Sequence, residues 1–149
     1  MKTIFAVMCA SIITAAPAYA HSDESLETQK APHGGQLRMA GAYHFELVLA
    51  KNSKGSQEVK ENPLIVYVTD HAGAKVSTAG ATGAATLLAG KLKASITLAP
   101  DGDNRMKGYA KYASTPDIKV VANIVFPGKA AEQARFAPMA VMKEEHIGH

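Results

Sequence analysis

The chain has 149 residues, a single cysteine and a formal charge of +3, and its basic residues are scattered among the acidic ones along the sequence. The scattered charge, the absence of Trp and the low aromatic content provide neither a basic patch nor a stacking platform, so we expect no nucleic-acid binding. No Gly-x-Ser-x-Gly elbow, phosphate-binding loop or His-Glu-x-x-His motif is present, and we expect that the protein is not an enzyme.

Residues 1–20 have the three parts of a secretory signal peptide. A basic start is followed by an apolar stretch and by the small-x-small sequence Ala18-Tyr19-Ala20. We therefore expect cleavage after Ala20 and a periplasmic mature protein. The apolar stretch is shorter than the roughly 20 residues that span a bilayer, so we expect no membrane insertion. Cys9 leaves with the signal peptide, and the mature domain then depends on its apolar core without a disulfide.

The mature chain predicts one β-rich domain. Residues 21–32 are polar and are expected to be a flexible leader, residues 33–137 carry strand signals, and residues 138–149 form a Met- and His-containing tail with a weak helical tendency. The clearest pattern, at 43–49, alternates apolar residues with His44 and Glu46, which places these two on the opposite face. Further strands are expected at 64–69, 75–78, 83–89, 91–99, 105–111 and 118–126, with edge strands at 35–38 and 135–136.

About seven such strands, separated by Gly, Pro, Asn and Asp clusters, predict an all-β fold. This number of strands is enough for two packed antiparallel sheets, and we expect an immunoglobulin-like antiparallel β-sandwich.

The tail offers one set of candidate metal ligands. Imidazole suits copper, zinc and nickel, and thioethers favour Cu(I). If the tail is helical, its candidate ligands share one face, because their spacing is i, i+3, i+7 and i+10. These are Met139, Met142, His146 and His149. In the alternative interpretation the methionines pack on the domain and the histidines are solvated.

The new N-terminus offers a different chemistry. After cleavage, the α-amino nitrogen and the Nδ1 atom of His21 can close a chelate ring on one ion, which suits Cu(II). The alternative is that a histidine follows the cleavage point by chance.

Three further histidines fall in the predicted domain. His33 precedes two glycines, which allow a tight turn and leave the imidazole exposed. His44 and Glu46 share one strand face and could add a nitrogen and an oxygen ligand, whereas the simpler interpretation is a solvated pair. His71 lies in a predicted turn and is a turn residue or a further ligand.

Five short segments together resemble small periplasmic proteins encoded alongside heavy-metal efflux systems. A similar His-Gly-Gly opening and Glu-Leu strand occur near the start of some periplasmic adaptor subunits of those pumps. The resemblance covers 33–136 and implies a β-sandwich in a metal-homeostasis setting. It includes His33, His44, Glu46 and His71 but not the terminal candidates. The segments are Pro32-His33-Gly34-Gly35, Tyr43 to Val48, Val66 to His71, Ala79 to Gly83 and Ala134-Arg135-Phe136.

These observations predict a periplasmic metal-binding accessory protein that buffers an ion or delivers it to an efflux adaptor subunit. Copper is the favoured ion, with zinc and nickel as alternatives. The rival hypothesis is a metal-free interaction module, in which an exposed strand edge pairs with an envelope partner and the histidines are incidental.

Overall fold

The computed structural model describes residues 23–50 and 58–139, and it is almost entirely β-structure. One short helix precedes eight antiparallel strands, which confirms the predicted all-β antiparallel fold. The immunoglobulin-like arrangement stays a prediction. The elements are α1 (Asp23–Glu27), β1 (Gln36–Ala40), β2 (Tyr43–Leu49), β3 (Lys60–Asp70), β4 (Thr82–Ala89), β5 (Leu92–Pro100), β6 (Arg105–Tyr112), β7 (Lys119–Val125) and β8 (Ala131–Phe136).

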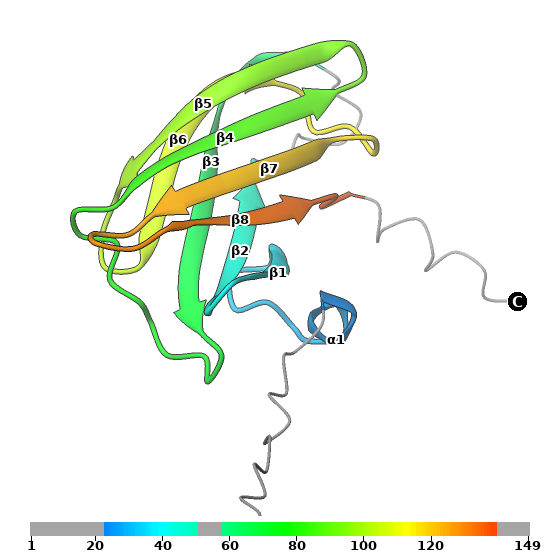
Figure 1. The fold of residues 1–149 in the computed structure, drawn as a ribbon. Coiled ribbons are helices and arrows are strands. Elements are labelled where there is room, and N and C mark those ends of the chain that lie inside the picture. The colour runs from blue at the N-terminus through cyan, green and yellow to red at the C-terminus, as the bar shows by residue number, and fades with distance from the viewer. Residues whose placement is uncertain (1–22, 51–57, 140–149) are drawn as a thin grey trace, which may run out of the picture.

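The strands form a single sheet that folds over on itself in the order β1-β2-β3-β6-β5-β4-β7-β8. Figure 1 shows β5, β4, β7 and β8 lying across the half formed by β1, β2, β3 and β6. The two halves join where β5 pairs briefly with β6, through Ala99 with Lys107 and Pro100 with Met106. The outer strands β1 and β8 also approach each other, and the Ala137 N–H donates to Gln36 Oε1 at 2.9 Å. The result is a barrel-like shape.

The core lies between the two halves and is filled by alternate residues of the strands. In β2 the inward residues are Tyr43, Phe45, Leu47 and Leu49, as the period-two pattern predicts. The other strands contribute side chains of the same kind, which include Leu64, Val66, Val68, Leu87, Ile96, Leu98, Met106, Val120, Ile124 and Phe136.

One local prediction, the strand at 75–78, is wrong. The segment 75–78 is not a strand, because its backbone bonds go to different parts of the fold: the Val76 N–H donates to Val68 O and the Thr78 N–H to Asp103 O. It is the crossing from β3 to β4, and only Lys75 forms an isolated bridge, with Thr69.

Part of the expected leader, 21–32, lies within the described residues. Residues 23–27 form α1, and Leu26 is only 1% exposed. The segment is attached to β1 by two polar contacts. Asp23 Oδ1 accepts from the Met39 N–H at 2.7 Å, and Glu27 lies 2.9 Å from Arg38. One apolar anchor and two polar contacts therefore hold a segment whose composition is mostly polar. Within the described ranges, no helix has the length and apolar character to cross a membrane.

A buried tyrosine joins three parts of the first half of the sheet, and its removal should weaken the fold. The Tyr112 hydroxyl donates to Pro63 O and accepts from the Ala50 N–H, and burial raises the pKa of this phenol. Tyr112→Phe leaves both backbone groups without their partner, so we expect a loss of about 1–3 kcal/mol in unfolding free energy, measured with urea. Tyr109→Phe, on the exposed side of the same strand, should change it by less than about 0.5 kcal/mol. Equal effects of the two substitutions would contradict this role.

Candidate metal site

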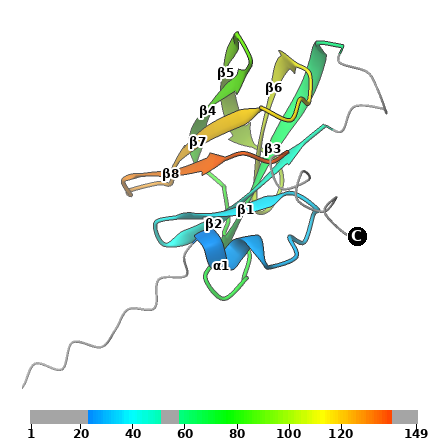
Figure 2. The ribbon, with the colours of Figure 1, turned by 90° about the vertical axis from the view of Figure 1, so that its right-hand side faces the viewer.

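The outer face of β2 carries the predicted pair His44 and Glu46. Both side chains point away from the core, as the alternation predicts, but neither is solvated: the residues are 6% and 2% exposed. The solvated-pair interpretation is therefore wrong. Glu46 is covered by the chain between α1 and β1, which lies against this face beside β2 (Figure 2), and the His71 ring stacks on His44. A segment outside the strand thus buries what the strand pattern alone would leave in water.

His33 and Glu46 form the main polar contact between that segment and the sheet. The His33 N–H donates to Glu46 Oε1 at 2.7 Å, and His33 Nδ1 lies 3.1 Å from Glu46 Oε2. An ionised carboxylate only accepts, so Nδ1 carries the proton in this pair. The carboxylate of Glu46 is thereby engaged by the backbone and side chain of one residue. This geometry favours Glu46 as the group that positions His33.

The His33 ring is also fixed from its face. It stacks on Tyr67 with ring centroids 3.6 Å apart and an interplanar angle of 3°. Tyr67 lies on β3, where its register partners are Glu46 on β2 and Arg105 on β6. A hydrogen bond with Tyr67 raises the pKa of Arg105, and the nearby carboxylate of Asp101, at 3.1 Å, acts in the same direction. The imidazole is thus held at Nδ1 and on one face, while its side chain is 41% exposed.

A cavity of about 100 Å³ connects His33 with the end of the described chain. Its lining includes His33, Gly34 and Gly35 on one side, residues 47–49 of β2, and Pro138 with Met139. Two of the predicted ligands, an imidazole and a thioether, therefore line one space. Their sharing of one cavity could not be foreseen from spacing, because the two residues are far apart in the sequence.

The two glycines after His33 have separate backbone reasons. Gly34 has a φ of +73°, which favours glycine. Gly35 lies so close to β2 that an added Cβ would come within 2.2 Å of Leu47 O. The pair therefore lets the chain pass directly over the strand before entering β1, which brings the preceding histidine to Glu46.

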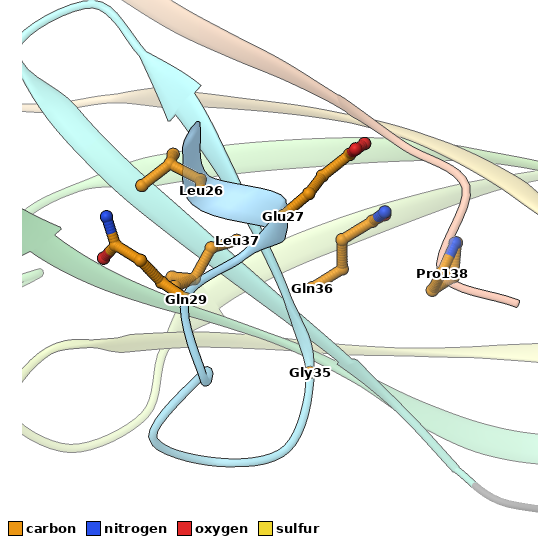
Figure 3. A pocket seen from close by; sticks show the side chains of 7 residues that line it. All are labelled: Leu26, Glu27, Gln29, Gly35, Gln36, Leu37 and Pro138. Carbon is orange, nitrogen blue, oxygen red and sulfur yellow. The ribbon is translucent and has the colours of Figure 1, made fainter. Parts of the chain in front are cut away.

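A second cavity, of about 110 Å³, shares Gly35 and Pro138 with the first, and Figure 3 shows its lining residues. Its ionisable lining residue is Glu27, which is paired with Arg38. We assign no metal to it. The cavity is lined by Leu26, Glu27, Gln29, Gly35, Gln36, Leu37 and Pro138.

His44 and His71 form a separate pair. Their ring centroids lie 4.9 Å apart with an interplanar angle of 24°, and His71 Nε2 lies 3.2 Å from Gly41 O. The structure thus divides the predicted ligands of the domain into two groups, one around His33 and one around His44. In the part of the chain that the structure describes, no three His, Cys, Asp or Glu side chains cluster as a metal site.

Four of the predicted ligands lie outside the described residues, and the sequence analysis did not identify Tyr67, on which His33 stacks, or the two charged residues that interact beyond Tyr67. The first set is His21, Met142, His146 and His149. The second set is Tyr67, Arg105 and Asp101. Tyr67 does occupy an outward position in the alternation of its strand, but only the register of β3 against β2 shows that it faces Glu46.

Comparisons of the chain with protein-family models, with curated proteins and with solved structures give no match.

The contact between His33 and Glu46 should be energetically coupled. His33→Phe keeps an aromatic ring on Tyr67 but removes the nitrogen that bonds the buried carboxylate, so we expect a loss of about 1–3 kcal/mol in unfolding free energy. A double-mutant cycle with Glu46→Gln, followed by urea unfolding, isolates the pair. A coupling energy of about 1 kcal/mol or more is expected, and additive effects of the two substitutions would contradict the contact.

Gly35 should tolerate a side chain poorly. Gly35→Ala forces the chain away from Leu47 O, and we expect it to lower the unfolding free energy by more than Gly128→Ala does. Gly128 is the control because its φ is +70° but an added Cβ meets nothing within 4 Å, so its cost is about 1–2 kcal/mol from backbone strain alone. Thermal unfolding of both variants makes the comparison, and a milder effect at Gly35 would contradict the close approach.

Proposed function

We propose that this protein is a periplasmic metal-binding accessory protein, with copper as its ion, that buffers the ion or delivers it to an efflux system. The observation that supports the proposal is the orientation of His33 by a buried carboxylate. Histidines that ligate metals usually donate their other ring N–H to a carboxylate, a carbonyl or a water, which fixes the tautomer and raises the basicity of the ligand nitrogen. His33 has this arrangement with Glu46, and its Nε2 is then the nitrogen that carries the lone pair.

Copper is favoured by the second ligand that the cavity offers. Met139 lines the same space as His33, and a thioether beside an imidazole is a soft donor set that suits Cu(I). The next residues along the chain supply more donors of the same kind, at Met142, His146 and His149. Zinc and nickel accept imidazole as well, so they serve as competitors in the test.

A role in buffering or transfer agrees with the partial solvent exposure of His33. The His33 side chain is 41% exposed, so an ion bound there can be approached by ligands of another protein and passed on by exchange. The link to an efflux adaptor, and the periplasmic location, rest on the signal-like N-terminus and on the resemblance carried by the His-Gly-Gly and Glu-Leu segments.

One observation favours the rival function, a metal-free interaction module. The hydrogen bonds between Glu46 and His33 hold the chain before β1 against the sheet, and this structural role is enough to explain why both residues are there. In that case the imidazole serves the fold, and the protein acts through its surface.

Competition titrations of the mature protein with Cu(I), Cu(II), Zn(II) and Ni(II) distinguish the two functions. We expect copper to bind with a dissociation constant below micromolar. His33→Phe should weaken binding by at least tenfold, and Glu46→Gln by about 10- to 100-fold through loss of the orienting group. Met139→Leu should weaken Cu(I) more than Cu(II), whereas the matched control Met106→Leu, in the core, should leave both unchanged.

The absence of sub-micromolar binding for every ion would overturn the proposal and favour the metal-free module. Tight binding that is unaffected by His33→Phe and by Glu46→Gln would show that the ion binds elsewhere and would contradict the His33 site. Circular dichroism of each variant shows whether the fold is retained.

A further inference from the structure

We infer that the tip of the β4–β5 hairpin is a docking surface for the headgroup region of an anionic lipid bilayer. This β4–β5 tip comprises residues 88–93, in which Gly90-Lys91 is the two-residue turn between the strands. The contact is peripheral, since it involves a few side chains at one end of the molecule. It goes beyond the proposed function and uses none of the candidate metal ligands.

The first observation is a pair of leucines that are exposed on opposite faces of the hairpin. Leu88 is 42% exposed and Leu92 is 37% exposed. Leu88 points outward, because its neighbour Leu87 is buried in the core. Leu92 is on the core-facing side of β5, an even number of positions from the buried Ile96. Its exposure shows that the β4–β5 tip extends past the end of the core.

The second observation is that three lysines surround these leucines. The register places Leu88 between Lys93 on β5 and Lys119 on β7, and Lys91 lies in the turn itself. All three lysines are exposed. Lysine can lay its apolar stem along a buried leucine while its ammonium group reaches a phosphate. The tip therefore combines apolar side chains with cations in the way that a headgroup region requires.

One carboxylate lies beside the turn, and it is engaged by the protein. Asp117 accepts from the Thr115 hydroxyl at 2.6 Å and from the Gly90 N–H at 2.8 Å. These hydrogen bonds lower the pKa of Asp117, so it is ionised and holds the turn in place. Three lysines and one carboxylate give this end of the hairpin a net charge of +2.

The outer face that continues from the β4–β5 tip also lacks negative charge. The structure describes β4, β5, β7 and β8 in full, and none of their outward positions carries an acidic residue. Arg135 on β8 adds a further cation to this face. An anionic surface that meets the tip is therefore not repelled by the face behind it.

The arrangement of the leucines favours a bilayer over a protein as the partner. A protein packed on the outer face would cover Leu88 and leave Leu92 in water, because the two leucines are on opposite faces. Lipid headgroups can close around a protruding tip and cover both. Each cation near an anionic membrane also strengthens binding by about fivefold.

The position of the tip leaves the candidate metal site accessible. Figures 1 and 2 both place the β4–β5 tip at one end of the molecule and α1 toward the other. The chain between α1 and β1, which carries His33, lies toward the α1 end. A protein docked by its tip therefore directs the His33 side away from the lipids.

A tryptophan reporter tests the contact directly, because the sequence contains no Trp. In the mature protein, Leu92→Trp places an indole at the tip. The control Val125→Trp places one at a 40% exposed position, paired with Thr82 at the opposite end of β4. With vesicles of phosphatidylglycerol and phosphatidylcholine, we expect the emission of Leu92→Trp to shift to the blue and that of Val125→Trp to stay unchanged. Vesicles of phosphatidylcholine alone should shift neither.

Cosedimentation with the same mixed vesicles measures what each group contributes. Lys93→Gln and Lys119→Gln should each weaken binding by about fivefold. Replacing Leu88 and Leu92 together by Gln should weaken it by at least about tenfold. Lys75→Gln, in the crossing after β3, is the matched control and should change binding by less than about twofold.

Three results would overturn the inference. They are no blue shift in Leu92→Trp, equal binding to the neutral vesicles, and equal weakening by the tip variants and by Lys75→Gln. If the tip variants bind vesicles like the wild-type protein but lose binding to poly-L-glutamate, the surface recognises an acidic protein and the lipid assignment fails. Circular dichroism of each variant verifies the fold.

Discussion

A buried carboxylate on the outer face of a strand is the constraint on which this side of the molecule depends. Glu46 is 2% exposed, and an ionised carboxylate removed from water is unfavourable unless donors compensate it. The donors come from the backbone and ring of His33. Since those atoms belong to the segment before β1, compensating the charge also places that segment over β2. The close passage of Gly35 over Leu47 is part of the same arrangement.

The positions of the neighbouring side chains on the outer face follow from the contact between Glu46 and His33. With His33 held over Glu46, its ring lies on Tyr67, and the cavity beside it is also lined by Met139 from the chain after β8. The segment before His33 continues into α1, where Leu26 is buried and Asp23 bonds to the backbone of β1. The polar residues His44 and Glu46, which would otherwise lie on a solvated sheet surface, are therefore buried. This is why the His33 ring has a defined orientation.

Much of the fold could be predicted because its signals are local. The alternation over 43–49 gives the observed bounds of β2 and the correct faces for His44 and Glu46. The strand predicted at 75–78 is wrong because apolar, β-branched residues also suit a crossing segment whose hydrogen bonds go to separate neighbours. The solvated-pair interpretation of His44 and Glu46 is wrong for a related reason. Periodicity shows which way a side chain points, but it does not show what covers it.

The sequence by itself determined the class of fold, the face of each β2 residue and the ligand chemistry available, since these follow from period-two alternation and from residue type. Only the tertiary structure decided which residues meet. His33 pairs with Glu46, 13 residues away, and faces a cavity shared with Met139, while His44 pairs with His71. Such meetings depend on strand register and on how the sheet folds over. Those are properties of the whole chain, because a shift of one residue in register would exchange every side chain between the two faces.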